Sequence, residues 1–387
     1  WGQTDISTIQ SYINMRNNYG VPLWMGESGE NSNHWYYEVF KLLEENNIGW
    51  NFWTHKKVDK ITSPYSALVT PQYQVIIDYL RGSIAQPDPN IAGMGLTSFA
   101  NSLKIENCIT RPGVIASLTD AEYGEISKPY ITHSIPGTIP AAYYDIGARG
   151  LSYSDSDYWN DGDGGYNDGW VFRNDGVDVE GSDADPNIPY TVGWTEAGEW
   201  LGYTIEDVLP GTYDVSFSIS APDAGGIFYA QLSGQNLGVI DVPSTGGWYS
   251  WEDIPSQRIE IGEGEKFLKI QIVQAGFNIQ SITFDQVLSI DNQNLNADSF
   301  VLGNPYPNPF NPSVEINLLI DNPGTYQVNI HNIKGELINN WNVNFTQKGN
   351  HIIQWNAMNY SGLLMPSGVF FINVMNQNKS KQRKVLL

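Results

Sequence analysis

The chain has 387 residues, enough for two or three domains. Its 42 Asp and Glu against 20 Lys and Arg leave a formal net charge of -22, which repels nucleic-acid phosphates and anionic lipid but is compatible with a neutral polysaccharide. The single cysteine, Cys108, excludes an intrachain disulfide, and no apolar run is long enough to predict a membrane span. The 13 Trp and 22 Tyr exceed what packing usually needs and favour surfaces on which flat rings stack.

A strand, a helix and a second strand are predicted near the N-terminus. The apolar residues Leu23 to Met25 end at Gly26 and predict a buried strand that delivers Glu27 to a loop. Ser32 can cap a helix whose apolar residues recur at helical spacing as far as Asn46, and residues 48–53 predict the second strand. This order predicts a βαβ unit.

The ends of these two strands bring an acid and an indole together. In parallel barrels the functional groups lie where the strands end, so we expect Glu27 and Trp53 at the rim. The flat C–H faces of a pyranose stack on indole, and a carboxylate can be the nucleophile of a retaining glycosidase. From the residues alone, a surface glutamate after a strand remains the alternative.

Residues 21–29 (Val-Pro-Leu-Trp-Met-Gly-Glu-Ser-Gly) and 49–57 (Gly-Trp-Asn-Phe-Trp-Thr-His-Lys-Lys) resemble the C-terminal part of a glycoside hydrolase family 5 catalytic domain, a (β/α)8 barrel of cellulases and mannanases. The resemblance covers residues 1–118 and implies a partial barrel, with Glu27 as the nucleophile and Trp53 lining the subsite of the cleaved sugar.

Two further residues of this region are candidates for substrate contact, namely Trp1 and His34. The family carries its general acid/base glutamate on the fourth strand, which would lie upstream of this sequence. Retaining hydrolysis needs two carboxyl groups about 5 Å apart. We therefore expect the parent protein to be an enzyme and this chain alone to be inactive.

Beyond this unit the pattern stays helical for a while. Residues 71–81 predict an amphipathic helix, and residues 91–118 continue in helical style. Residues 119–134 then mix Pro, Gly, Ser and acids without periodicity. They are predicted to be a linker.

Residues 135–287 show short alternating strands that are separated by clusters of Gly, Pro, Asn and Asp, which predicts an all-β sandwich. Three segments, residues 192–203, 243–251 and 276–279, resemble a carbohydrate-binding module of family 6. The resemblance implies a jelly-roll, lectin-like sandwich with a cleft between its loops.

In that family two aromatic residues clamp a sugar ring and an asparagine binds its hydroxyl groups. The resemblance assigns the aromatic roles to Trp194 and Trp251, with Trp248 as the alternative for the second, and the amide role to Asn278. Because positions 248 and 251 differ by an odd number, strand alternation places the two rings on opposite faces. Trp200, in a strand-like run, is expected in the core.

No cofactor is expected. The acidic run with which the family helps to hold a structural calcium ion is replaced here by Pro140-Ala141-Ala142. Five aspartates of a Gly-rich loop offer oxygen ligands but do not follow the EF-hand pattern, so we interpret the loop as solvated. They are Asp155, Asp157, Asp161, Asp163 and Asp168.

Residues 288–299 are rich in Asn and Asp and predict a second linker. Residues 300–387 again alternate as strands and predict a small Ig-like sandwich. Its opening at 305–312 (Pro-Tyr-Pro-Asn-Pro-Phe-Asn-Pro) and its ending at 382–387 (Gln-Arg-Lys-Val-Leu-Leu) resemble the C-terminal sorting domain of type IX secretion. This implies the secretion machinery as a partner and a secreted or cell-surface location; an ordinary Ig-like accessory module is the alternative.

Together these expectations describe a multidomain protein: a partial (β/α)8 barrel followed by two all-β sandwiches. The predicted function is that of a secreted modular β-1,4-glycanase acting on β-glucan, xylan or mannan, of which this chain retains glycan binding. A non-catalytic, surface-anchored glycan-binding protein is one alternative. Adhesion through purely structural sandwiches is another.

Overall fold

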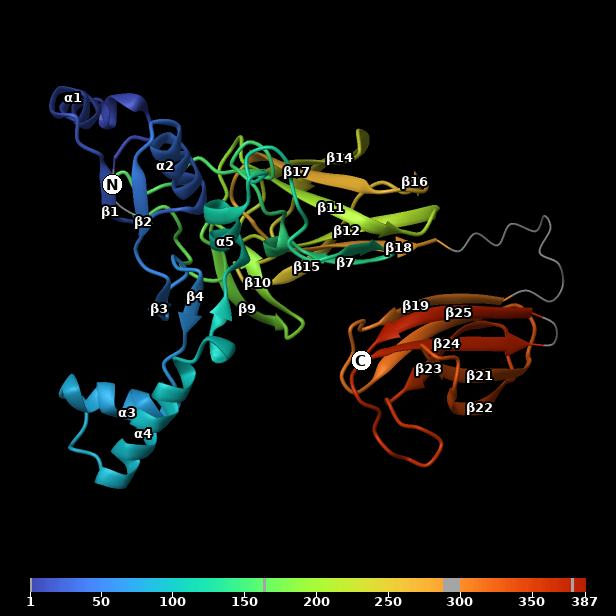
Figure 1. Cartoon of the computed structure of the whole chain (residues 1–387). Coiled ribbons are helices and arrows are strands. Elements are labelled where there is room, and N and C mark those ends of the chain that lie inside the picture. The colour runs from blue at the N-terminus through green and yellow to red at the C-terminus, as the bar shows by residue number, and fades with distance from the viewer. Residues whose placement is uncertain (1, 163–164, 288–299, 377–378) are drawn as a thin grey trace. The chain divides into compact units, whose positions relative to one another are not determined.

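The computed structural model describes residues 2–162, 165–287, 300–376 and 379–387. The chain forms two compact units, Trp1–Leu288 and Ser289–Leu387 (Figure 1). The first contains an N-terminal α/β part and a β-sandwich, and the second is a smaller β-sandwich. The linker expected at residues 288–299 lies outside the described residues.

The N-terminal part confirms the predicted βαβ unit. Strands β1 and β2 pair in parallel, with Trp24 opposite Gly49, and helix α2 connects them. The predicted cap is present, because the Ser32 hydroxyl accepts a hydrogen bond from the Trp35 amide at 3.3 Å. This sheet has two strands in the described part of the chain, so a partial barrel is not confirmed. The elements are η1 (Ile6–Thr8), α1 (Gln10–Tyr19), β1 (Trp24–Ser28), α2 (Asn33–Glu45), β2 (Gly49–Phe52), β3 (Lys56–Val58) and β4 (Tyr65–Ala67).

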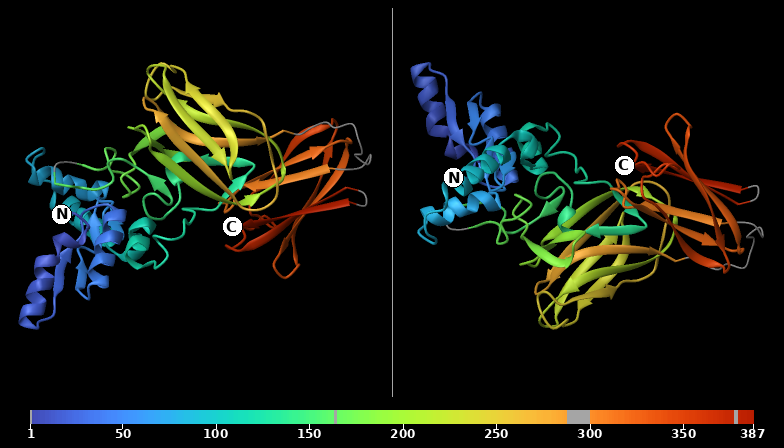
Figure 2. Two further views of the ribbon diagram at one scale, coloured as in Figure 1. Left: turned by 90° about the horizontal axis from the view of Figure 1, so that it is seen from above. Right: turned by 90° about the horizontal axis from the view of Figure 1, so that it is seen from below.

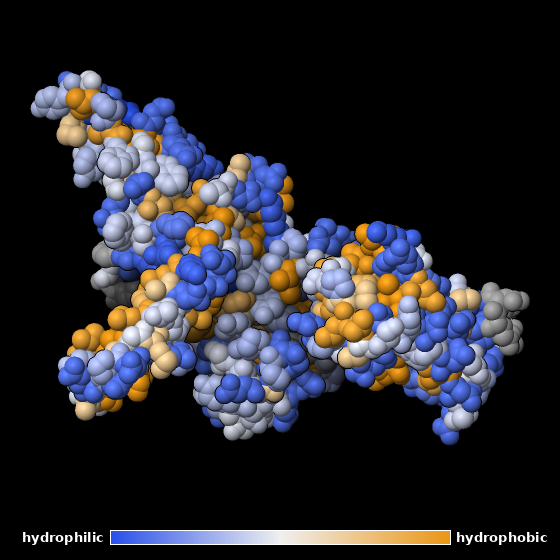
Figure 3. Space-filling view, turned by 60° about the horizontal axis from the view of Figure 1, so that its bottom comes forward, coloured by the Kyte–Doolittle hydropathy of each residue, from blue (hydrophilic) through white to orange (hydrophobic). Residues whose placement is uncertain are grey.

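Two helices form a hairpin after this unit. Helix α3 (Pro71–Leu80) agrees with the predicted amphipathic helix, and α4 (Pro89–Ser102) packs against it through stacked Tyr73 and Phe99 rings 4.1 Å apart. Apolar side chains such as Leu80 stay exposed, and Figure 3 shows apolar residues gathered there. The helical run expected over 91–118 is interrupted by η2 (Ile105–Asn107) and β5 (Ile109–Thr110) before α5 (Pro112–Thr119).

Residues 119–134, expected to be a linker, are packed between the two parts of the first unit. Tyr123 is buried, and its ring lies 5.3 Å from that of Tyr37 in α2. Lys128 exchanges two backbone hydrogen bonds with Ile146. The segment therefore contacts both parts through side chains and backbone, which its lack of periodicity does not reveal.

The following β-sandwich has two facing sheets (Figures 1 and 2). One has the order β15-β12-β18-β10-β9, with β16 beside β12 and β7 beside β18; the other has the order β14-β13-β17-β11-β6, with β8 beside β11. The strands are β6 (His133–Ile135), β7 (Gly137–Pro140), β8 (Tyr153–Ser154), β9 (Val179–Asp185), β10 (Ile188–Val192), β11 (Trp200–Val208), β12 (Gly211–Ser220), β13 (Gly226–Leu232), β14 (Gln235–Val242), β15 (Trp251–Pro255), β16 (Ile259–Ile261), β17 (Lys266–Gln274) and β18 (Asn278–Gln286), and η3 (Ala141–Tyr143) follows β7.

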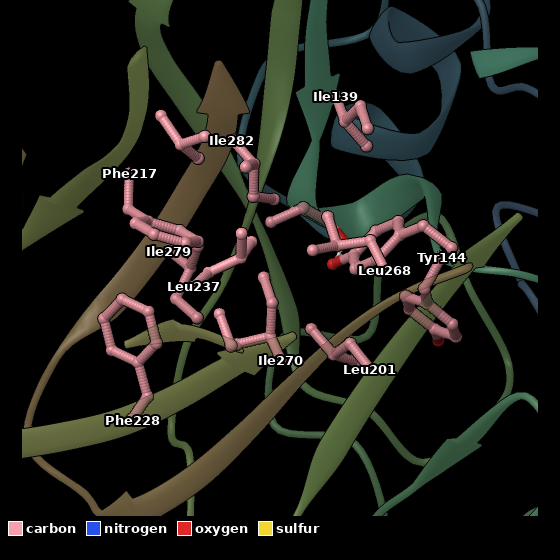
Figure 4. Close-up of a cluster of buried hydrophobic side chains, with 14 of the residues drawn as sticks. Ile139, Tyr144, Leu201, Phe217, Phe228, Leu237, Leu268, Ile270, Ile279 and Ile282 are labelled. Atoms are coloured by element: carbon pink, nitrogen blue, oxygen red, sulfur yellow. Dashed lines mark hydrogen bonds between the residues drawn. The ribbon is translucent and has the colours of Figure 1, made fainter. Parts of the chain in front are cut away.

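The core lies between these sheets. Phe217 and Phe228 come from opposite sheets and meet edge to face, with ring centres 4.9 Å apart. Figure 4 shows these rings among the aliphatic side chains of both layers, including Ile270 and Ile279. Every second residue of the long strands is buried, as the alternation in the sequence predicts.

The second unit is also a two-layer β-sandwich, which fits the expected Ig-like fold. One sheet has the order β19-β20-β23 and the other β22-β21-β24-β25. The core includes Trp355, whose indole nitrogen donates to the Met358 carbonyl at 2.9 Å. The strands are β19 (Phe300–Tyr306), β20 (Val314–Ile320), β21 (Gly324–Asn332), β22 (Leu337–Phe345), β23 (Gly349–Trp355), β24 (Val369–Asn376) and β25 (Lys379–Leu386).

A buried ion pair lies where the sandwich meets the N-terminal part. Arg173 lies 2.7 Å from Asp175, and both side chains are almost fully buried. Arg173 also donates to the carbonyls of Tyr144 and Asp145, while Asp175 accepts from the Tyr144 hydroxyl and from the Asn33 amide. Both charges thus have several partners, which is the condition under which a buried pair is tolerated.

We expect the Arg173→Met substitution to lower the free energy of unfolding by about 3–5 kcal/mol, because Asp175 would stay buried without its cation. Urea denaturation measures the change. The matched control is Arg258→Met, which breaks a surface pair with Asp214 and should cost about 1 kcal/mol or less. Equal losses in the two variants would contradict the prediction.

Candidate functional site

A cleft of about 350 Å³ opens between loops at one end of the first sandwich. Its position follows from the sheet order, because β10 and β18 are neighbours and the loops that flank them meet there. Further walls come from the loop after β8 and the loop before β15. The lining residues are Asp155, Ser156, Asp157, Asn167, Asp168, Asp178, Trp194, Thr195, Glu196, Glu199, Trp248, Ala275, Gly276 and Phe277.

Two half-exposed tryptophans face this cleft. Trp194 and Trp248 are 48% and 46% exposed, although large apolar rings are usually buried. The backbone of Trp194 has φ of 44°, in the left-handed region that costs a residue with a side chain about 1 kcal/mol. Backbone strain of this kind concentrates at functional sites. The chain thus holds an indole at the surface at some cost in stability.

The structure distinguishes between the two rings considered for the second aromatic position. Trp248 lines the cleft beside Trp194. Trp251 instead begins β15 opposite Ser220, is half-buried and is not among the described residues that line the cleft. The alternative, Trp248, is therefore the ring that the fold brings to Trp194.

Asn278 was predicted to bind sugar hydroxyl groups. In the structure its side chain is buried and contacts the loop that carries Trp248. It is 4% exposed, and its amide donates to the Trp248 carbonyl at 3.2 Å and to Glu180 at 3.4 Å. A Cβ atom at Gly193 would lie 2.9 Å from the Asn278 side-chain oxygen. In this structure Asn278 positions the loop of Trp248 and is not among the described residues lining the cleft.

The cleft is acidic. Six of its lining residues are Asp or Glu, and no Lys, Arg or His is among the lining residues that the structure describes. Burial, followed by the charge of Glu199, raises the pKa of Asp155 to about 8. Burial and the charge of Asp168 raise the pKa of Asp178 to about 7, although Asp178 accepts a hydrogen bond from the Asp168 amide. The carboxylates therefore repel one another.

The expectation of a solvated acidic loop is wrong for Asp155, which is 4% exposed. Its side chain accepts a hydrogen bond from the Asp157 amide at 2.9 Å. Asp157, Asp161 and Asp168 are exposed. Asp163 lies outside the described residues.

The raised pKa of Asp155 predicts a pH-dependent stability. The pKa of this carboxyl is about 8 in the folded chain against an ordinary value of 3.8 for an exposed aspartate, so the folded state holds the proton more tightly. The stability that protonated Asp155 contributes is fully present below pH 3.8 and is lost as pH rises towards about 8.

Thermal unfolding measured from about pH 6 to about pH 9 should show a steeper fall of the melting temperature for the parent chain than for Asp155→Asn, which cannot ionise. Asp223→Asn, on an exposed turn, is the control and should follow the parent; parallel curves for Asp155→Asn would contradict the assignment.

A second cavity, of about 420 Å³, contains Glu27 and Trp53. Glu27 lies near the carboxyl end of β1, and Trp53 directly follows β2, so the parallel strands bring both to one edge. Glu30 is the other acid of this cavity and is ion-paired with Lys57. The remaining lining residues are Gly2, Gln3, Thr8, Ile9, Tyr12, Met25, Ser28, Gly29, Trp35, Val39, Leu42 and Leu43.

The other two candidates for substrate contact are Trp1 and His34. Trp1 lies outside the described residues. His34 is buried in the first turn of α2, where its Nδ1 accepts from the Arg149 amide at 3.2 Å and its Nε2 lies 3.1 Å from Glu38. His34 therefore contacts the sandwich and is not among the described residues that line the cavity.

Both sandwiches match models of known protein families. Residues 173–284 match the model of a carbohydrate binding module, family 35. The first sandwich is similar to carbohydrate-binding modules. The sequence resemblance pointed to family 6, whereas the model that matches is that of family 35. Residues 304–387 match the model of a secretion system C-terminal sorting domain.

One relative is the clotting factor G alpha subunit of Tachypleus tridentatus, 32% identical over 100 residues. These residues are 25% of this chain and 15% of that relative, so the chain spans a small share of its length.

Two similar solved structures are family 6 carbohydrate-binding modules. The C-terminal module of a marine laminarinase from Zobellia galactanivorans is 24% identical, with 38% of this chain and 95% of that chain covered and a TM-score of 0.28. A module of a Cellvibrio mixtus lichenase in complex with cellotriose is 21% identical, with 40% and 98% covered and a TM-score of 0.29. With TM-scores this low, the assignment rests on the family models.

The sorting domain implies that the protein is secreted or lies at the cell surface. In the described part of the chain, no helix has the length and apolar character needed to cross a membrane.

Proposed function

We propose that this chain binds an uncharged β-linked glycan in the cleft between Trp194 and Trp248. The observation that carries the proposal is that two exposed indoles share one cleft within a segment that matches a carbohydrate-binding module. The apolar faces of a pyranose stack on indole rings, and a concave site with a few polar groups fits a small part of a polymer.

The acidic lining supports an uncharged ligand. Sugar hydroxyl groups can donate to carboxylates such as Asp157 and Glu196 at the mouth of the cleft, and such charge-assisted bonds are stronger than neutral ones. A sugar that carries its own carboxylate would meet like charges and lose its hydration. The proposed ligands are therefore β-glucan, xylan or mannan.

We expect Trp194→Ala and Trp248→Ala each to abolish most of the retardation of the chain in affinity electrophoresis through gels that contain soluble glucan, xylan or mannan. Loss of one stacking face should weaken binding by about 1–3 kcal/mol, about 5- to 150-fold. Trp251→Ala should have a smaller effect, because this ring lies outside the cleft lining.

The matched control is Trp24→Ala, which removes a 67% exposed tryptophan on β1. It should leave retardation unchanged. If the parent chain were not retarded by any of these glycans, the sandwiches would be structural modules and the proposal would fail.

A second candidate function concerns the Glu27 cavity. We propose that Glu27 is the nucleophile of a retaining glycoside hydrolase of the family 5 type, with Trp53 beside the sugar. The shared cavity of these two residues supports this role. Retaining hydrolysis also needs an acid about 5 Å away, and the other acid of the cavity, Glu30, is engaged by Lys57. The glycanase would thus be the whole enzyme to which residues 1–118 belong.

We expect no hydrolysis of soluble β-glucan, xylan or mannan by this chain alone, measured as reducing ends released over a day. The reason is that a nucleophile without a general acid cannot expel the leaving oxygen. Measurable turnover that disappears in Glu27→Gln would contradict this expectation and show that the chain supplies its own acid.

The proposed export route is type IX secretion, with residues 300–387 as the signal-bearing domain. Support comes from the match of residues 304–387 to a sorting domain. The non-catalytic alternative, a surface-anchored glycan-binding protein, shares this route and the cleft. This alternative differs from the glycanase only in that its binding module is not joined to a hydrolase.

A further inference from the structure

In the loop that forms one wall of the cleft, some residues line the cleft and others contact the N-terminal part. Residues 155–157, 167–168 and Asp178 line the cleft. Between them, residues 158–160 and 172–175 turn the other way and contact the N-terminal part of the same unit. Cleft-lining and contacting stretches thus alternate along one irregular segment.

The strongest of these contacts joins Asn31 to Asn160. The Asn31 side-chain amide donates to the Asn160 carbonyl at 3.0 Å, and its oxygen accepts from the Asn160 amide at 2.8 Å. One side chain therefore satisfies both backbone groups of a loop residue, as a neighbouring strand would. Asn31 is fully buried.

A second contact holds the far end of the loop. The Asn174 amide donates to the Asn31 carbonyl at 2.8 Å and to the Asn33 side-chain oxygen at 3.0 Å. The Asn33 backbone amide donates in turn to the Asn174 carbonyl at 2.8 Å. The Tyr158 ring meets the His34 ring edge to face at 5.3 Å. The loop is thus fastened at both ends to the start of α2.

We infer that the start of α2 positions the acidic wall of the glycan cleft, with Asn31 as a positioning residue for glycan binding. The inference rests on the proposed function of the cleft. The wall carries Asp157 and Asp168, whose like charges favour separation. Contacts on the opposite face counter this repulsion. They order the wall before a ligand arrives, so that binding does not have to supply the ordering entropy.

Asn31→Ala in the full chain tests the inference. We expect affinity for the glycan that retards the parent chain to fall about tenfold, as for loss of preorganisation at a binding loop. Hydrogen exchange of the amides of residues 157–160 should become faster, while that of the core strands β12 and β18 stays unchanged. Asn31→Asp keeps an acceptor for the Asn160 amide but turns a buried carboxylate oxygen towards the Asn160 carbonyl, so it should lose at least as much affinity as Asn31→Ala.

The matched control is Asn18→Ala, which removes an exposed asparagine of α1 and should change neither affinity nor exchange. Faster loop exchange with unchanged affinity would overturn the inference, and so would unchanged exchange in Asn31→Ala. If the parent chain binds no glycan, both the proposed function and the inference are wrong. If the parent chain binds a glycan tightly and Asn31→Ala binds it equally well, only the inference is wrong.

Discussion

The structure of the first unit depends on a buried, fully partnered set of polar groups around Arg173 and Asp175. A charge pair in a protein interior is stable only when every lone pair and proton finds a partner, because neither charge keeps its hydration. Here the partners come from the backbone after η3, from Tyr144 and from Asn33 of the N-terminal part. The pair therefore fixes the course of a long irregular segment in a place where no strand or helix does so.

Residues of that segment line the cleft. The cleft combines two indole rings with a group of carboxylates, an arrangement that suits a ligand with apolar faces and many hydroxyl donors. Burial, followed by the charges of neighbouring carboxylates, raises the pKa values of Asp155 and Asp178. A wall of this composition needs support from behind, and the asparagines at the start of α2 provide it. The same loop thus lines the cleft with some of its residues and contacts the N-terminal part with others.

The modular arrangement separates three tasks. The first sandwich is similar to carbohydrate-binding modules, and the second matches the model of a sorting domain, which implies export. The N-terminal part brings an acid and an indole into one cavity. Its parallel sheet has two strands in the described part of the chain, fewer than a sheet usually has. Within the described residues it serves as the support of the cleft wall.

The sequence by itself determined the local elements of this protein. The alternation around Phe217, the helical spacing of α3 and the cap at Ser32 each depend on neighbours along the chain, and each was predicted correctly. The choice of Trp248 over Trp251, the burial of Asp155 and the turn of His34 towards the sandwich were decided only by the tertiary structure. Each depends on contacts between residues that are far apart in sequence, such as Arg149 against His34. Periodicity carries no information about such contacts, because it reports which face of an element is apolar and not what covers that face.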